Sequence, residues 1–121
     1  MAQPSRFSQL SPARQALVRA CQAVNFGEIQ NVLVRDAEPV FGEPAPVVVI
    51  DAKLDKQEEP RPELALKDFE LREQVRRLMA RLDDVKNGAI LRIEVRAGIP
   101  RRVVFESRLA KASATTLTLR R

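Results

Sequence analysis

The sequence predicts an α+β fold in which two helix–hairpin (αββ) units build one mostly antiparallel sheet of about five strands, with two helices on one face. The length of 121 residues and the apolar content of 45% suit a single small domain over residues 1–121. Two segments have a helical apolar period, and a strand–turn–strand pattern follows each of them. A unit of about 30 residues cannot bury its own core, so the two units must pack together.

The first unit is expected over residues 11–54, after a flexible N-terminal tail at residues 1–10. This tail has no apolar run long enough for a signal peptide or a membrane anchor. Ser11 can cap a helix that begins at Pro12, because its hydroxyl accepts a backbone N–H and the proline ring presets φ. The helical spacing of the apolar residues predicts a helix over residues 12–24. Its buried face is expected to hold Leu17, Ala20, Cys21 and Val24.

Three strands are expected in the rest of the first unit. Phe26–Gly27 ends the helix, a strand follows at Glu28–Arg35, and a turn leads to a return strand at Val40–Phe41. A third strand is expected at Val47–Ile50, continuing to Leu54. Because four apolar residues follow one another in that strand, the sequence predicts that both of its faces are buried.

Residues 55–66 are expected to form an extended acidic connector, since charges and two prolines leave little to bury. The second unit is expected over residues 67–109, with Asp68 as the cap of its helix. An apolar stripe marks the buried face of this helix at Leu71, Val75, Leu78, Met79, Leu82 and Val85. The opposite face holds Arg72, Glu73, Arg76, Arg77 and Arg81.

The second hairpin is expected after Asn87–Gly88, which ends this helix. A strand at Ala89–Arg96 and a turn at Ala97–Gly98 lead to a return strand at Arg101–Phe105. The alternation predicts Leu91, Ile93 and Val95 on one face of the first of these strands and Arg92, Glu94 and Arg96 on the other. The tail at residues 110–121 ends in two arginines, and its composition fits an edge strand or disorder.

An offset of 61 residues aligns the two halves of the chain without a gap. The alignment places Gly27 on Gly88, Ile29 on Ile90, Val32 on Ile93, Val34 on Val95, Arg35 on Arg96 and Pro39 on Pro100, with Leu17 on Leu78 and Val24 on Val85 in the helices. It indicates an internal repeat of the helix–hairpin unit. Turn chemistry alone is the alternative, because any two such segments need Gly, Val and Pro at these places.

The first unit carries a G-x-I-x-x-V-x-V-R-D pattern from Gly27 to Asp36, preceded by Asn25-Phe26. In this pattern it resembles the small bacterial YezD-type proteins, a family without a characterised activity. The resemblance implies one helix and one hairpin, and it brings no catalytic residue. This chain departs from that pattern by Ala37, where a turn glycine would be expected, by its third strand and by its greater length.

The net charge of +5 is unevenly distributed: residues 1–27 carry +3, residues 28–65 carry −5 and residues 66–121 carry +7. The basic second half could neutralise phosphates, so nucleic-acid binding is one hypothesis. Its contacts would come from Arg72, Arg76, Arg77, Arg81, Arg92, Arg101 and Arg102. A solvated face of mixed charge is the alternative, because acids lie near several of these arginines and no aromatic residue is placed for base stacking.

The composition argues against an enzyme, and no catalytic, cofactor-binding or metal-binding residue is expected. The chain has no histidine, the commonest general base and zinc ligand. The pairs Glu58–Glu59 and Asp83–Asp84 are neighbours in sequence and do not converge on a pocket, so we expect solvated carboxylates there. Cys21, the single cysteine, is expected to be a small buried hydrophobe in the reducing cytoplasm.

The leading hypothesis is therefore a cytoplasmic, non-enzymatic module for protein interaction or self-association; an enzyme of unknown type ranks third, after nucleic-acid binding. Two layers leave one face of the sheet uncovered, so apolar side chains on that face would need a partner. The candidate interface residues are Leu33, Val47, Val48 and Val49. The expected partner is another protein or a second copy of the chain in a homo-oligomer such as a dimer, and no membrane is expected.

Overall fold

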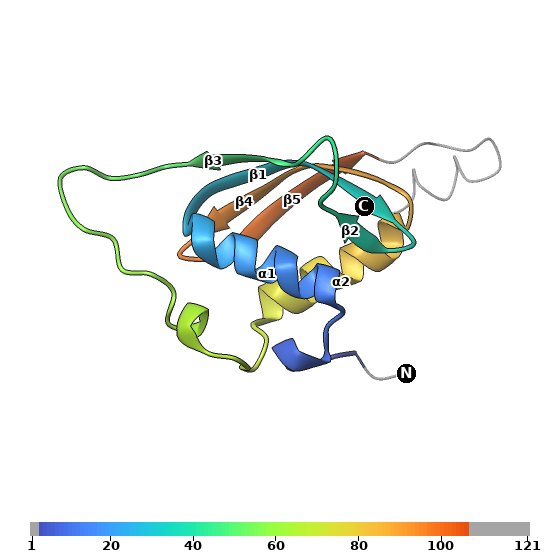
Figure 1. Cartoon of the computed structure of the whole chain (residues 1–121), viewed down its shortest axis with the longest axis horizontal. Coiled ribbons are helices and arrows are strands. Elements are labelled where there is room, and N and C mark those ends of the chain that lie inside the picture. The colour runs from blue at the N-terminus through green and yellow to red at the C-terminus, as the bar shows by residue number, and fades with distance from the viewer. Residues whose placement is uncertain (1–2, 107–121) are drawn as a thin grey trace.

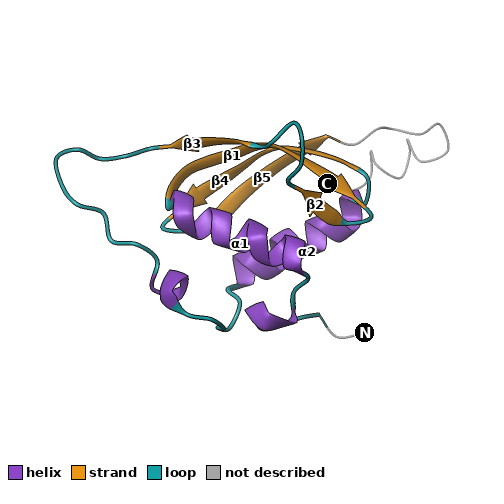
Figure 2. Ribbon diagram, viewed as in Figure 1, coloured by secondary structure: helices purple, strands orange, loops and turns teal. Residues whose placement is uncertain are grey.

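The computed structural model describes residues 3–106 of the chain. These residues form an α+β fold with two α-helices and a five-stranded antiparallel sheet, which confirms the predicted fold class (Figures 1 and 2). The elements in chain order are the short 3₁₀ helix η1 (Phe7–Gln9), α1 (Pro12–Val24), β1 (Phe26–Arg35), β2 (Glu38–Val40), β3 (Val47–Ile50), the short 3₁₀ helix η2 (Pro62–Ala65), α2 (Glu73–Val85), β4 (Gly88–Arg96) and β5 (Ile99–Glu106).

The sheet has the order β2–β1–β4–β5, and β3 also pairs with β1. Because β4 pairs along one edge of β1, β2 and β3 share the other edge. There β2 pairs with Leu33–Arg35 and β3 pairs with Gly27–Gln30. The predicted third strand is thus the second part of an interrupted return strand, and residues 41–46 form the loop between the two parts.

One hydrophobic core joins the two helices to the sheet. Its fully buried side chains include Leu17 of α1, Leu82 of α2, and Ile29 and Ile93 of the two central strands. Burying a side chain of this size contributes about 1.5–3 kcal/mol to the free energy of folding. The predicted buried face of α2 is confirmed at Val75, Leu78, Met79 and Leu82, and that of α1 at Leu17, Cys21 and Val24. Leu71 is also buried, but it precedes α2.

α1 begins and ends where the sequence predicts. The Ser11 hydroxyl accepts a hydrogen bond from the backbone N–H of Arg14 at 3.2 Å, which caps the first turn. Pro12 occupies the first helical position, as expected. Asn25 ends the helix with a φ of 63°, a left-handed conformation that asparagine tolerates better than most residues.

α2 begins at Glu73 and not directly after Asp68, so the predicted cap is wrong. The Asp68 carboxylate accepts a hydrogen bond from the backbone N–H of Ser8 at 2.8 Å and pairs with the Arg6 guanidinium at 2.9 Å. Arg6 and Glu70 also form a β-bridge. These contacts hold the chain before α2 in an extended conformation, and the helix can start only after them.

Residues 5–10 are bound to the domain, which differs from the expected flexible tail. Phe7 and Leu10 are buried, and Phe7 stacks on Phe69 with 4.8 Å between the ring centroids. The Arg19 guanidinium of α1 lies 4.3 Å from the centroid of the Phe7 ring. Arg19 also donates hydrogen bonds to the carbonyls of Glu63, Leu64 and Leu66. The end of the acidic connector is therefore fixed to α1 and is not a free spacer.

β3 is exposed, and the prediction that both of its faces are buried is wrong. The exposed fractions of its four residues lie between 45% and 61%. Among the strands of residues 3–106, it pairs only with β1 and forms an edge of the sheet. Its apolar run therefore does not mark a central strand, for which the same pattern is typical.

A β-bulge at Leu91 breaks the alternation predicted for the second hairpin. The register between β4 and β5 shifts between Ile90 and Arg92. Ile90 is buried in consequence, whereas Leu91 is 43% exposed. Ile93 and Val95 are buried. Of the three residues predicted to share this face, Leu91 is therefore the one for which the prediction is wrong.

Arg14 connects the two halves of the chain. Its side chain is only 11% exposed and pairs with Glu38 of β2 at 3.0 Å and with Asp83 of α2 at 2.6 Å. It also donates to the carbonyl of Ala37 at 2.8 Å. Asp83, expected to be a solvated carboxylate, thus takes part in the packing of α1 against α2. Removing the guanidinium would leave two carboxylates without their shared partner.

Within residues 3–106, none of the helices combines the length and the apolar content that crossing a bilayer requires. The tail predicted at residues 110–121 lies outside the described residues.

Candidate interaction surfaces

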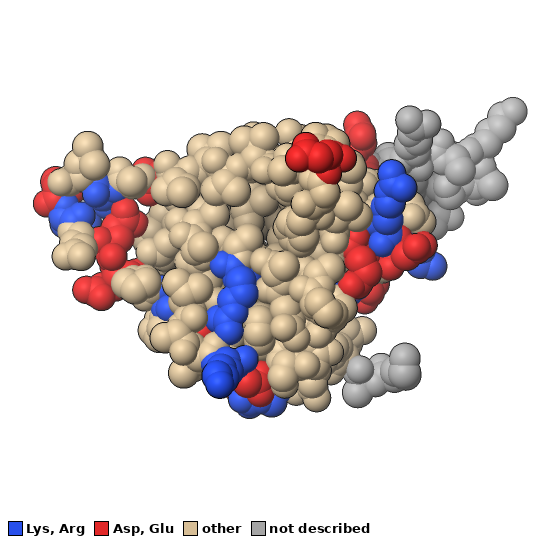
Figure 3. All heavy atoms as spheres, in the orientation of Figure 1, with Lys and Arg blue, Asp and Glu red and all other residues tan. Residues whose placement is uncertain are grey.

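An apolar strip of exposed side chains follows one stretch of the chain. Nine large hydrophobic residues are exposed in the part of the chain that the structure describes, and six of them fall within residues 41–54. We call these six the apolar strip: Phe41, Val47, Val48, Val49, Ile50 and Leu54. Leu54, in the loop after β3, is 98% exposed. In Figure 3 the surface over β3 is uncharged, which makes this edge of the sheet a candidate for contact with another chain.

The backbone of β3 has one edge bound to β1, and no strand among residues 3–106 pairs with its other edge, which we call the free edge. Asp51 donates its N–H to the Phe26 carbonyl at 2.8 Å, and the Val49 carbonyl also points toward β1, against Gly27. Alternate residues of a strand direct their backbone groups to opposite edges. Val48 and Ile50 therefore direct their N–H and C=O groups to the free edge, where a further strand could accept and donate hydrogen bonds.

Gly27 allows this close approach of β1 to β3. A Cβ atom at this position would lie 1.9 Å from the Val49 carbonyl oxygen, and the φ of Gly27 is 148°. Any other residue would push β3 away or change the backbone of β1. The glycine that the sequence assigns to the end of the first helix thus also positions the exposed strand.

The predicted interface residues do not all lie together. Val47, Val48 and Val49 are neighbours on β3, whereas Leu33 is half-buried and lies on the part of β1 that pairs with β2. Sequence reasoning missed Phe41, Ile50 and Leu54. Ile50 continues the valine run, and this run was the signal that could have included it.

Charged side chains lie on the outward side of the two central strands, although Leu91 of β4 is a further exposed apolar residue outside the β3 edge. Glu28 lies directly opposite Glu94, and Glu28 accepts a hydrogen bond from Gln30 at 2.9 Å. Glu94 pairs with Arg92 at 3.5 Å and with Arg102 at 3.8 Å. Two of the predicted nucleic-acid contacts are thus partly engaged by one carboxylate.

A groove between α2 and β5 collects arginines from distant parts of the sequence. We call it the arginine groove; it has a volume of about 500 Å³, and its lining includes Arg77, Arg81, Arg101 and Arg102. Arg77 pairs with Glu73 at 2.9 Å and Arg81 pairs with Asp84 at 3.3 Å, both on the surface of α2. Such exposed pairs are weak and exchange readily with another anion.

The other predicted nucleic-acid contacts on α2 lie outside the arginine groove. Arg72 lies 3.4 Å from Glu63, and Arg76 is exposed with no ion-pair partner within residues 3–106. Arg101 in the groove likewise has no ion-pair partner in this part of the chain. The structure therefore brings four of the seven predicted arginines to one groove.

Burial and contacts within the fold account for the shifted pKa values of Cys21 and Glu63. Burial raises the pKa of the Cys21 thiol to about 12, which keeps the thiol protonated. Burial also raises the pKa of Glu63, but the hydrogen bond from Arg61 and the nearby charges of Arg61 and Arg72 outweigh it, so that this pKa is lowered. Among residues 3–106, no three Cys, Asp or Glu side chains cluster as a metal site would require.

No family model, no curated protein and no solved structure matched this chain.

Proposed function

We propose that this protein is a non-enzymatic interaction module that binds an extended segment, of another protein or of a second copy, at the free edge of β3. The observation that carries the proposal is an exposed edge strand of four consecutive apolar residues. Soluble proteins usually protect such edges with charges, prolines or a covering element. Val47–Ile50 contains no charged residue and no proline, so the unprotected edge suits strand addition.

The architectural part of this proposal is that residues 12–40 and 73–101 are two copies of one helix–hairpin unit, with both helices on one face of the sheet. Two observations support the repeat: α1 and α2 each span 13 residues, and their bounds differ by 61. Both helices lie below the sheet in Figure 1, which supports the shared face. A cytoplasmic location belongs to the same proposal, because the single cysteine is a buried, unpaired thiol.

A labelled peptide tests the proposed edge binding. The probe is a fluorescein-labelled peptide with the sequence of residues 45–53, and its anisotropy is titrated with the protein. We expect saturable binding by the parent chain and at least a tenfold loss in V48P, because this substitution removes an N–H that is directed to the free edge and leaves the pairing with β1 intact. Arg77→Ala, on α2, should bind as the parent does. Equal binding by V48P, or none by the parent, would refute the proposal.

The arginine groove supports nucleic-acid binding as a second candidate. Arg101 and Arg102 come from β5 and face Arg77 and Arg81 of α2 across one groove, where a phosphate backbone would meet several guanidinium groups at once. This juxtaposition of residues far apart in sequence is what favours the candidate over a merely solvated basic surface.

Anisotropy with a labelled mixed-sequence duplex and a labelled single strand tests this candidate. We expect affinity to fall at least tenfold between about 50 and 200 mM salt, because neutralised phosphates release counterions. Arg101→Ala should weaken binding several-fold, whereas Arg76→Ala, on the same helix as Arg77 but outside the groove, should not. Absence of binding to both probes at low salt would remove nucleic acid from the candidates.

A further inference from the structure

We infer that the segment bound at β3 is β3 of a second copy of this chain, paired antiparallel about a two-fold axis through Val49. This inference rests on the proposed edge binding and names its occupant. It would join the sheets of two molecules into one continuous sheet, and the apolar strips of both copies would lie at the junction.

The direction of the backbone groups selects this register. Val48 and Ile50 carry the groups that face the free edge, since Val49 and Asp51 face β1. If Val48 of one copy lies opposite Ile50 of the other, the two-fold axis creates a second, equivalent pair. The backbone groups of Val48 and Ile50 from both copies can then form hydrogen bonds across the junction. A shift by one residue would oppose groups that point toward β1 and would lose these bonds. A shift by two residues would keep the direction of the groups but would leave only one hydrogen-bonded pair within Val47–Ile50.

Charge at the ends of the strand is compatible with the same axis. In this register Asp51 lies opposite Val47 of the other copy, so no acidic residue faces another acidic residue across residues 47–51. No charge lies in Val47–Ile50 itself, so self-pairing places no like charges opposite one another.

The other edge of the sheet is a poorer partner for β3. β5 carries Arg101 and Arg102, both exposed, which protect it against strand addition. Pairing of β3 with β5 would also be head-to-tail and would extend without closing, whereas pairing of β3 with itself closes at two copies. Self-pairing therefore explains why the sheet is apolar at its β3 edge and charged at its β5 edge.

The contact area sets the expected strength. The contact is one strand of four residues with few flanking apolar side chains, which is small against the roughly 1,200–2,000 Å² of a stable specific interface. We therefore expect a dimer that dissociates at micromolar concentrations and forms fully toward millimolar.

Disulfide trapping of cysteine variants tests the register. At the two-fold axis the residue 49 pair is not hydrogen-bonded, with Cα atoms about 4.5 Å apart, within the range of a disulfide. Two copies of residue 47 would lie about 13 Å apart, beyond that range. Under mild oxidation, V49C should give a covalent dimer on a non-reducing gel, and V47C, equally exposed and on the same face, should not. Cys21 is buried and should give no background.

Sedimentation equilibrium of the parent chain over micromolar to millimolar concentrations is the companion measurement. A reversible dimer together with selective trapping of V49C supports the inference. A strict monomer, or equal trapping of V49C and V47C, overturns it. If the chain stays monomeric but the peptide of residues 45–53 still binds and V48P abolishes that binding, the second copy is refuted while the proposed edge binding stands. If neither association occurs, both fail.

Discussion

Three side chains with long-range partners join the segments that surround the core. Arg14 links α1 to β2 and α2, Arg19 links α1 to the connector, and Asp68 links the chain before α2 to the N-terminal segment. Each is a charged group that forms a hydrogen bond with the backbone or with an opposite charge of another segment. Such charge-assisted bonds are stronger than neutral ones, so these residues order segments that contain little regular structure.

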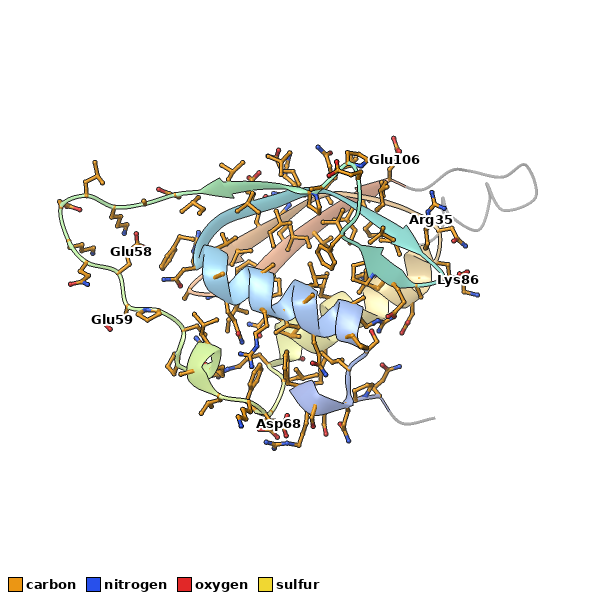
Figure 4. All side chains as sticks on the ribbon, in the orientation of Figure 1. Arg35, Glu58, Glu59, Asp68, Lys86 and Glu106 are labelled. Carbon is orange, nitrogen blue, oxygen red and sulfur yellow. The ribbon has the colours of Figure 1, made fainter. Side chains whose placement is uncertain are left out.

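Asp68 predicts how acid loosens the N-terminal segment. The hydrogen bonds from Arg6 and from the backbone of Ser8 lower the pKa of this carboxyl to about 2 in the folded chain, against about 3.9 when unfolded. Its contribution to stability is therefore complete above pH 4 and is lost as the pH falls toward 2. Asp68 is labelled in Figure 4, at the end of the molecule where the N-terminal segment meets the chain before α2.

The measurement is the melting temperature of the parent chain and of Asp68→Asn between pH 7 and pH 2. We expect Asp68→Asn to melt at a lower temperature than the parent at pH 7, and we expect this difference to shrink as the pH falls toward 2, where about half of the parent carboxyl is protonated. A difference that is constant across this range would contradict the assigned role. Glu59→Gln, in the exposed part of the connector, is the control and should not change the melting temperature at either pH.

The long-range partners of these three residues could not be predicted from the sequence, and the reason is physical. Arg14 lies in a helix that is predicted from the spacing of its apolar residues. Its partners, Glu38 and Asp83, are 24 and 69 residues away in the sequence. A charge pattern identifies partners three or four residues apart on a helix, as for Glu73 and Arg77. It contains no information on which distant carboxylate the fold will bring near.

At the scale of elements, α2 gives the sharpest test of which side chains face the core. Leu78 is buried in the hydrophobic core, whereas Arg77, its neighbour, is exposed and within residues 3–106 forms an ion pair with Glu73 alone. Leu78→Asp should unfold the domain, because an unpaired buried charge costs several kcal/mol against a total stability of about 5–15 kcal/mol. Arg77→Ala should change the stability by less than about 0.5 kcal/mol. Equal midpoints in circular dichroism melts of the two variants would contradict the assignment of faces.

Helices were predicted well from the sequence because their apolar period extends over several turns. The bounds of α1 were predicted to the residue, and α2 ends at Val85, where its stripe ends. The start of α2 was not predictable, because Asp68 is a good cap by residue type and loses this role only through Arg6 and Ser8. For β3, four apolar residues fit a central strand as well as an edge, and only the pairing partner distinguishes the two.

At the scale of the whole molecule, the pairing of β1 with β4 unites the two halves. Ile29 lies opposite Ile93, and Val32 lies opposite Ile90. Under the proposed repeat, Ile29 corresponds to Ile90 and Val32 to Ile93, so exchanging the two units exchanges these two pairs. The same symmetry gives each unit one outer edge of the sheet. The edges differ because the return strand of the first unit is interrupted by residues 41–46, and this interruption leaves β3 as a separate exposed strand.

Matched substitutions at Ile29 and Ile90 test whether the two halves behave as one cooperative unit. Both side chains are 1% exposed, and both belong to the same core. Ile29→Ala and Ile90→Ala should each lower the free energy of unfolding by about 2–5 kcal/mol, through lost burial and the cavity left behind. Leu91→Ala, next to Ile90 but on the exposed bulge, should cost less than about 1 kcal/mol. Urea unfolding followed by circular dichroism should show one transition in every variant, displaced to lower urea with an unchanged slope. Two separate transitions, of which each isoleucine variant moves only one, would mean that the halves are independent domains, because a core shared across β1 and β4 must lose its stability as a whole.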